Sequence, residues 1–151
     1  LMCGVFGERP GHQGKPLEWN ALLDPHAPAM VYRAPVAIHR SYGLDVTTKV
    51  VMQADEVRSR FQRGYLRPVL DFDEVWFKQR PSITFHDPLA AVGLFDPTVC
   101  TYDVGQVDVE LTQPDLLGQT KWQSSVDGKQ EIAVAVDTEH FFDHYFSVLA
   151  G

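Results

Sequence analysis

The sequence lacks three features that would point to particular partners: a cluster of basic residues, a long apolar run and closely spaced cysteines. Its 151 residues include 13 Lys and Arg against 20 Asp and Glu, a formal net charge of -7. Nucleic acids and anionic membrane surfaces are recognised by clustered positive charge, so the composition argues against both partners. No run of about 18 apolar residues occurs, which argues against a membrane-spanning helix. The charge is compatible with a neutral or cation-assisted small-molecule substrate.

Cysteine is scarce, and Cys3 and Cys100 lie far apart in the sequence. This usage favours two reduced thiols in a reducing compartment, with one Cys3–Cys100 disulfide as the alternative. The first residues contain neither a basic segment nor a long apolar one. We therefore expect no secretory signal here and a cytoplasmic location. Residues 1–5 have the character of a buried strand that enters a glycine turn, so we expect further chain upstream.

Helical and strand patterns alternate along the chain, which predicts an α/β fold. The 44% hydrophobic and 22% charged content suits a globular protein, and the length suits one domain over residues 1–151. An Asp127-Gly128 pair predicts a hairpin turn between the last two strands, and each of these strands can pair with 107–111. The predicted helices cover 25–33, 54–62, 66–79, a stretch beginning at Asp87, and 138–149. The predicted strands cover 36–42 (continuing through 44–48), 107–111, 119–123 and 131–136.

The central motif is an apolar run, 83–85, that leads into His86-Asp87-Pro88. Asp at a helix N-cap followed by Pro is a strong helix start, because the carboxylate accepts amide hydrogens that would otherwise lack partners. One interpretation makes Asp87 only a cap and His86 only a packed ring. The other places both in a site, with Asp87 directed to a metal or sugar and His86 as a proton donor.

A second candidate segment follows a loop rich in Gly and Pro over residues 4–17. Glu18 and Asn20 flank Trp19, and residues spaced i, i+2 point the same way from an extended backbone. They are either a solvated carboxylate and a turn-forming amide, or paired ligands for a substrate. The loop is long enough to be a lid or binding loop.

Two further groups have a structural and a functional interpretation. Trp76 and Phe77 lie shortly before the central motif, and such aromatics either belong to the core or stack on a heterocycle. His140 and His144 are one helical turn apart, which is also a metal-ligand spacing. With no third ligand nearby in the sequence, we expect them to lie on a solvated face.

Taken in order, several motifs resemble the C-terminal half of the inosine–uridine nucleoside hydrolase family. The resemblance implies a Rossmann-like α/β fold, with a mixed sheet, flanking helices and a C-terminal β-hairpin region. It also implies a calcium-assisted nucleoside N-ribohydrolase of purine or pyrimidine salvage, which releases ribose and a free base from a small-molecule nucleoside. The motifs are Met2, Glu18-Trp19-Asn20, Asp24-Pro25, Gly43-Leu44-Asp45-Val46-Thr47, His86-Asp87-Pro88-Leu89-Ala90, Asp96-Pro97 and Val107-Asp108-Val109-Glu110-Leu111.

The resemblance assigns a role to each candidate residue. An oxocarbenium-like transition state leaves electron density on the departing base, which an imidazole with a pKa near neutrality can protonate. Calcium prefers about 6–8 oxygen ligands and can polarise a bound water. The implied roles are a metal ligand (Asp87), the acid for the base (His86), ribose contacts (Met2, Glu18, Asn20) and base stacking (Trp76, Phe77).

The sequence departs from the family pattern at its main metal-binding motif. The family's Asp-x-Asp-x-Gly-x-Asp-Asp cluster is missing, and Asp71-Phe72-Asp73-Glu74 lacks its glycine. In place of a ribose-binding Asn, the loop offers His12, Gln13 or Lys15. The chain therefore resembles half an enzyme: a fragment, one partner of a separate N-terminal half, or a chain that has lost catalysis. The alternative function is a non-catalytic module for binding or oligomerisation, and we expect either a homo-oligomer or pairing with the missing half. By itself the chain should be inactive.

Overall fold

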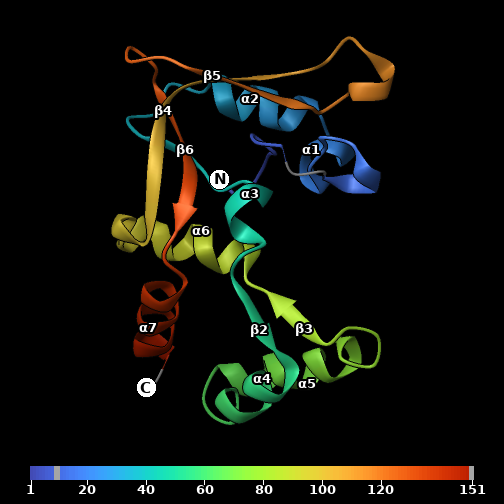
Figure 1. Ribbon diagram of the computed structural model, residues 1–151, viewed down its shortest axis with the longest axis vertical. Helices are drawn as coiled ribbons and strands as arrows, with labels where there is room; N and C mark the ends of the chain where they lie inside the picture. The colour runs from blue at the N-terminus through green and yellow to red at the C-terminus, as the bar shows by residue number, and fades with distance from the viewer. Residues whose placement is uncertain (9–10, 150–151) are drawn as a thin grey trace.

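The computed structural model describes residues 1–8 and 11–149, and it has an α/β architecture with two sheets. The larger sheet has the order β1-β6-β4-β5 and is mixed, because β1 runs parallel to β6 while β4 is antiparallel to both neighbours. Strands β2 and β3 form a separate antiparallel pair at the other end of the molecule (Figure 1). The strands are β1 (His39–Ser41), β2 (Val51–Gln53), β3 (Ser82–Thr84), β4 (Cys100–Val109), β5 (Thr120–Ser124) and β6 (Gln130–Val136).

The helices flank these sheets, as the resemblance implied. Helices α1 and α2 lie near β5, α3 and α6 lie at the centre, and α4 and α5 lie beside β2 and β3 (Figure 1). They are α1 (Trp19–Leu23), α2 (His26–Arg33), α3 (Leu44–Thr47), α4 (Ala54–Arg60), α5 (Leu66–Trp76), α6 (His86–Phe95) and α7 (Thr138–Leu149), with short 3₁₀ helices at His12–Gly14, Pro97–Val99 and Pro114–Leu116. The predicted helices are confirmed, and the last has the predicted bounds.

The strand predicted at 36–42 is shorter than expected, and its continuation through 44–48 is wrong. Only His39–Ser41 is a strand, and the chain then turns at Gly43 into α3. The Leu44 amide donates to Gly4 O (2.9 Å) and the Thr47 amide donates to Gly43 O (3.0 Å). Contacts with the N-terminal segment thus override the strand preference of these β-branched residues.

The Asp127-Gly128 pair does not close a hairpin. Strands β5 and β6 lie on opposite sides of β4, so their connection must cross that strand. A Cβ on Gly128 would lie 2.3 Å from the Gly105 Cα, and the crossing therefore requires glycine. Strand 119–123 pairs with 107–109 as predicted, whereas β6 pairs with Cys100–Gly105, a part of β4 that the pattern did not reveal.

The main core forms where α4, α5, α6 and α7 converge. Val57 and Phe61 lie four residues apart and are fully buried there. Phe85 lies edge-on to three aromatic rings of α7, with centroids 5.1–5.9 Å away. These contacts anchor the chain one residue before His86, and so they position the start of α6.

Candidate functional site

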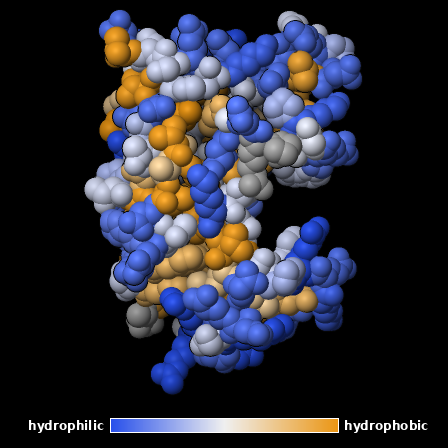
Figure 2. Space-filling view, viewed as in Figure 1, coloured by the Kyte–Doolittle hydropathy of each residue, from blue (hydrophilic) through white to orange (hydrophobic). Residues whose placement is uncertain are grey.

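The molecular surface is hollowed between the lobe of β2, β3, α4 and α5 and the part of the molecule that contains α1 (Figure 2). Helix α3 and the beginning of α6 lie at the back of this notch (Figure 1). Ligands of α/β proteins commonly bind beyond the carboxyl ends of strands, and α3 directly follows the carboxyl end of β1. The notch is therefore where the predicted site residues are best sought.

His86 is the first residue of α6 and is held by a side chain from α3. Its Nδ1 lies 2.8 Å from Thr47 Oγ1, and Thr47 is fully buried. The backbone of the preceding residue is also fixed, because the Phe85 amide donates to Val50 O (2.9 Å). The ring is thus held from two elements that are distant in sequence.

Asp87 is not the cap of α6, so that interpretation is wrong. The helix begins one residue earlier, with Phe85 at the N-cap position and the Leu89 amide donating to Phe85 O (3.2 Å). The buried Phe85 ring sets this start, and Asp87 consequently lies inside the first turn with an exposed side chain. A carboxylate there is favoured by the helix dipole.

Met2 and Asn20 are brought together, as a shared site requires. Asn20 Nδ2 lies 3.4 Å from Met2 O and 3.6 Å from Met2 Sδ. Met2 also forms a parallel bridge with Tyr42, one residue before the N-cap of α3. The N-terminal segment therefore joins the Asn20 side of the site to the α3 side.

Glu18 and Asn20 do not project together from an extended strand, contrary to the prediction. Glu18 is the N-cap of α1: its Oε1 accepts from the Asn20 amide (2.9 Å) and its Oε2 from the Ala21 amide (3.2 Å). Only 3% of Glu18 is exposed. Burial, together with the nearby Glu18 carboxylate, raises the pKa of the Cys3 thiol to about 12. Cys3 and Cys100 are both free and buried, which agrees with reduced thiols.

The loop before Glu18 is tied to α3 at its start. The Asp45 carboxylate accepts from the Phe6 amide (2.7 Å) and the Gly7 amide (3.0 Å). Further along, the His12 ring lies 5.0 Å from the Trp19 ring. Residues 9 and 10 of this predicted lid lie outside the described residues. Helix α3 thus contacts the loop through Asp45 and His86 through Thr47.

Trp76 and Phe77 belong to the lobe on the other side of the notch. Phe77 is half-buried against the main core, with the Arg58 guanidinium 5.1 Å from its ring centroid. Trp76 is 52% exposed and donates from Nε1 to Ser82 O (2.9 Å). Phe77 thus fits the core interpretation, whereas the exposed Trp76 offers a face for stacking.

His140 and His144 do not lie on a merely solvated face. Asp96 Oδ2 lies 2.9 Å from His140 Nε2 and 3.5 Å from His144 Nδ1, so these groups tie α7 to the end of α6. Two hydrogen bonds from Thr98, with a further effect of the two histidines, lower the pKa of Asp96. The sequence could not reveal this contact, because Asp96 is more than 40 residues from either histidine.

The described residues do not form a complete calcium site. Within 1–8 and 11–149, no group of three or more His, Cys, Asp or Glu side chains could hold a metal ion. Calcium prefers about 6–8 oxygen ligands, and Asp87 could supply at most two of them. The chain's own residues therefore do not fit the whole coordination sphere that the resemblance implied.

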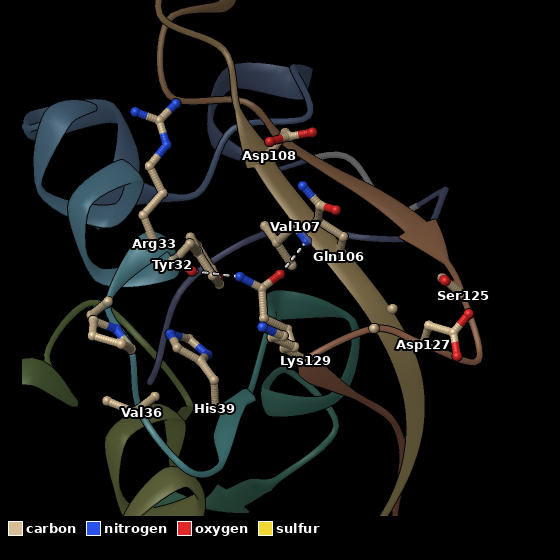
Figure 3. A pocket seen from close by; sticks show the side chains of 15 residues that line it. Tyr32, Arg33, Val36, His39, Gln106, Val107, Asp108, Ser125, Asp127 and Lys129 are labelled. Carbon is tan, nitrogen blue, oxygen red and sulfur yellow. Dashed lines mark hydrogen bonds between the residues drawn. The ribbon is translucent and has the colours of Figure 1, made fainter.

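A separate cavity of about 480 Å³ lies between α2, β4 and the turn before β6 (Figure 3). His39 stacks on Tyr32 at 5.0 Å, and its buried Nδ1 has no hydrogen-bond partner among the residues that the structure describes. Arg33 and Lys129 are balanced in its lining by two aspartates, so the cavity favours no single sign of charge. None of the seven predicted site residues lines it.

Known proteins are similar to this chain in sequence and in fold. The chain is 27% identical to a curated inosine-uridine preferring nucleoside hydrolase of Leishmania major and 28% identical to one of Crithidia fasciculata, over 94% and 80% of its length. Its fold matches the solved structure of a purine-preferring ribonucleoside hydrolase from Gardnerella vaginalis, with a TM-score of 0.82 and 25% identity over the whole chain. The chain spans 48% and 40% of the two curated relatives and 51% of the solved chain. The family model described as inosine-uridine preferring nucleoside hydrolase matches residues 1–143, and the chain therefore belongs to that family.

Proposed function

We propose that this chain is a nucleoside N-ribohydrolase, or the C-terminal portion of one, that splits ribonucleosides into ribose and free base. The observation that carries the proposal is the His86 ring, bonded to buried Thr47 and followed by exposed Asp87, in a chain of this family. The relatives are named for inosine, uridine and purine nucleosides, and we extend this substrate class to the present chain.

His86 is the proposed acid. As the bond between the sugar C1′ and the base nitrogen breaks, its electron pair moves to the base, and a proton from the imidazole neutralises that charge. Water adds to C1′ and completes the hydrolysis. Because the Thr47 hydroxyl is bonded to Nδ1, this role assigns the transferable proton to Nε2.

Met2, Asn20 and Glu18 are the proposed ribose contacts. Asn20 and Met2 already touch, and an amide next to a thioether offers both polar and apolar contact to a sugar. Each Glu18 oxygen accepts one backbone hydrogen bond and retains a second lone pair for a ribose hydroxyl. Glu18 is 3% exposed, so a contact with ribose requires a change that uncovers its carboxylate.

Asp87 is the proposed ligand that this chain contributes to a calcium ion, and Trp76 and Phe77 are the proposed contacts to the base. When bound, calcium would orient the ribose hydroxyls and polarise a water. Its other protein ligands would come from outside the described residues. We further propose that residues 1–151 act as one domain of a cytoplasmic protein of nucleoside salvage, as a homo-oligomer or paired with an N-terminal half. Among the described residues, none of the helices combines the length and the apolar character that a bilayer span requires.

A catalytically incomplete module for binding or oligomerisation is the alternative function. The incomplete metal site favours it, as do Leu94 and Phe95, which are 80% and 81% exposed at the end of α6. A calorimetric titration with calcium tests the incomplete metal site on which both ideas depend. The 151-residue chain alone should show no tight calcium site, and a tight site would contradict the incomplete coordination sphere.

Ribose release from inosine and uridine tests the proposed activity. The full product of the gene should release ribose in the presence of calcium, and His86→Ala should lower kcat by about 100-fold or more, the usual contribution of a general acid. His26→Ala is the matched control, because His26 is an exposed histidine on α2. Full activity of His86→Ala would remove the role assigned to His86, and the absence of ribose release by the wild-type gene product would favour the binding module.

A further inference from the structure

We infer that Thr47 is the positioning residue of His86: its hydroxyl fixes the orientation of the imidazole and keeps the Nδ1 proton in place while Nε2 acts. The inference deepens the proposed function and rests on it for its catalytic consequence. It depends on the 2.8 Å contact between Thr47 Oγ1 and His86 Nδ1. These residues are 39 positions apart, so the contact is a property of the fold.

Thr47 is held rigidly enough to serve this purpose. The residue is 0% exposed, so bulk water cannot replace its hydroxyl. Helix α3 is fixed at its first turn by the Leu44 amide on Gly4 O, and Asp45 on the same helix binds the Phe6 and Gly7 amides. A one-turn helix that is bonded to the N-terminal segment at two residues can hold one hydroxyl in a constant position.

The other partner is equally constrained. Phe85 is packed against three rings of α7, and its amide is bonded to Val50 O. The bond between Thr47 Oγ1 and His86 Nδ1 favours one orientation of the ring. A buried hydroxyl requires a hydrogen-bond partner, and His86 Nδ1 lies at hydrogen-bond distance from the Thr47 hydroxyl.

The bond also determines which ring nitrogen can release a proton. In the imidazolium form both nitrogens carry hydrogen, and Nδ1–H donates to the Thr47 oxygen. When the C1′–N bond breaks, the base nitrogen receives the bond electrons and the Nε2 proton. The ring is left as the neutral Nδ1–H tautomer, which donates to the same oxygen. Thr47 therefore supports the ring before and after transfer without rearrangement.

The adjacent residue provides a matched control. Thr48 has the same side chain and lies at the end of the same helix, but its hydroxyl donates to Leu44 O (2.6 Å). Thr47→Val and Thr48→Val thus remove the same atom from neighbouring positions. Thr47→Ser restores a hydroxyl at the first position, and thermal unfolding of all three variants checks that each remains folded.

The test combines ring NMR of the 151-residue chain with kinetics of the full gene product. The His86 ring-nitrogen signals are identified by their loss in His86→Ala. Thr47→Val should shift the Nδ1 signal, change the tautomer ratio and displace the His86 titration midpoint, whereas Thr48→Val should leave all three unchanged. Thr47→Val should also lower kcat by about five- to tenfold, as expected for one lost hydrogen bond, with KM changed less than about twofold. Thr47→Ser should restore most of the wild-type ring signals and most of the wild-type kcat.

The two proposals fail in different ways. If Thr47→Val and Thr48→Val give the same ring signals and the same kcat, the positioning role is refuted while ribose release by the wild type still supports the proposed function. If the wild type releases no ribose, the proposed function is refuted. A ring response confined to Thr47→Val would then still support Thr47 as the group that orients His86. A shift in the pH dependence of kcat that occurs in Thr47→Val and not in Thr48→Val supports both proposals.

Discussion

Phe141→Ala should destabilise the protein and disturb the site, because Phe141 joins α7 to the residue that precedes His86. Phe141 is 0% exposed and its ring packs edge-on against Phe85 at 5.9 Å and stacks with Tyr145 at 5.7 Å. Truncation of a buried Phe costs about 3–5 kcal/mol, and each lost aromatic pair accounts for about 0.5–1.5 kcal/mol beyond its buried area. We therefore expect a loss of about 4 kcal/mol in the free energy of unfolding.

Urea unfolding followed by circular dichroism measures this loss. With a denaturant slope of about 2 kcal/mol per molar, the midpoint should fall by about 2 M. The control is Phe72→Ala, because the Phe72 ring is 78% exposed on α5 and should change the unfolding free energy by less than about 0.5 kcal/mol. The His86 ring signals should also broaden or shift in Phe141→Ala. A loss below about 1 kcal/mol would refute the conclusion that α7 anchors the start of α6.

The remaining predictions concern a cap, a carboxylate and the thiols. Glu18→Ala should lower the unfolding free energy by about 1–2 kcal/mol, since it removes the N-cap of α1, and an unchanged thermal midpoint would contradict the cap assignment. Hydrogen bonds from Lys121 and the Thr112 hydroxyl lower the pKa of Glu110 to about 2, so its contribution to stability is complete above its unfolded pKa of about 4.3 and is lost as the pH falls towards 2. Glu110→Gln should flatten the dependence of stability on pH in that interval, and an unaltered slope would show that Glu110 is not responsible. Cys3 and Cys100 are both buried, and burial raises their thiol pKa values to about 12 and 11. A disulfide reagent at pH 8 should therefore modify two thiols in urea and almost none in the folded chain. Rapid modification of the folded chain would contradict the burial of these groups.

Local patterns predicted the elements whose structure depends on local interactions. Helix α7 has its predicted bounds because a cap at Asp137 and two rows of aromatics identify it without reference to the rest of the chain. The Asp24-Pro25 motif likewise begins a helix, with Asp24 Oδ1 accepting from the His26 and Ala27 amides (3.1 Å each). The same motif at Asp87 fails because the buried ring of Phe85 starts that helix earlier.

Long-range contacts account for what the sequence did not reveal. The strand preference of residues 44–48 yields to contacts with Gly4, and the Asp127-Gly128 turn becomes a crossing over Gly105. Neither feature can be recognised from the sequence of ten neighbouring residues. The preference of one residue for helix or strand amounts to less than about 1 kcal/mol. A tertiary contact that stabilises the other conformation by more than this can therefore override it.

In the candidate site too, local motifs were predictable from the sequence and long-range contacts were not. The motif order proposed Met2, Asn20 and His86 as site residues, and the structure places Met2 and Asn20 in contact. It did not identify Thr47 as the partner of His86, because only folding brings α3 to the start of α6. The extended geometry expected around Trp19 was wrong because Glu18 caps a helix there. An acidic residue directly before a possible helix was the signal that could have suggested the cap.

Chemical-shift mapping of the 151-residue chain with ribose tests most directly whether the notch lined by α3 is the sugar site. We expect saturable shifts at Met2, Asn20 and the His86 ring, with shifts at Thr47 through its bond to that ring. Shifts confined to Tyr32, His39 and Lys129, around the separate cavity of Figure 3, would contradict the placement of the site. An absence of shifts at all seven positions at saturating ribose would contradict it equally.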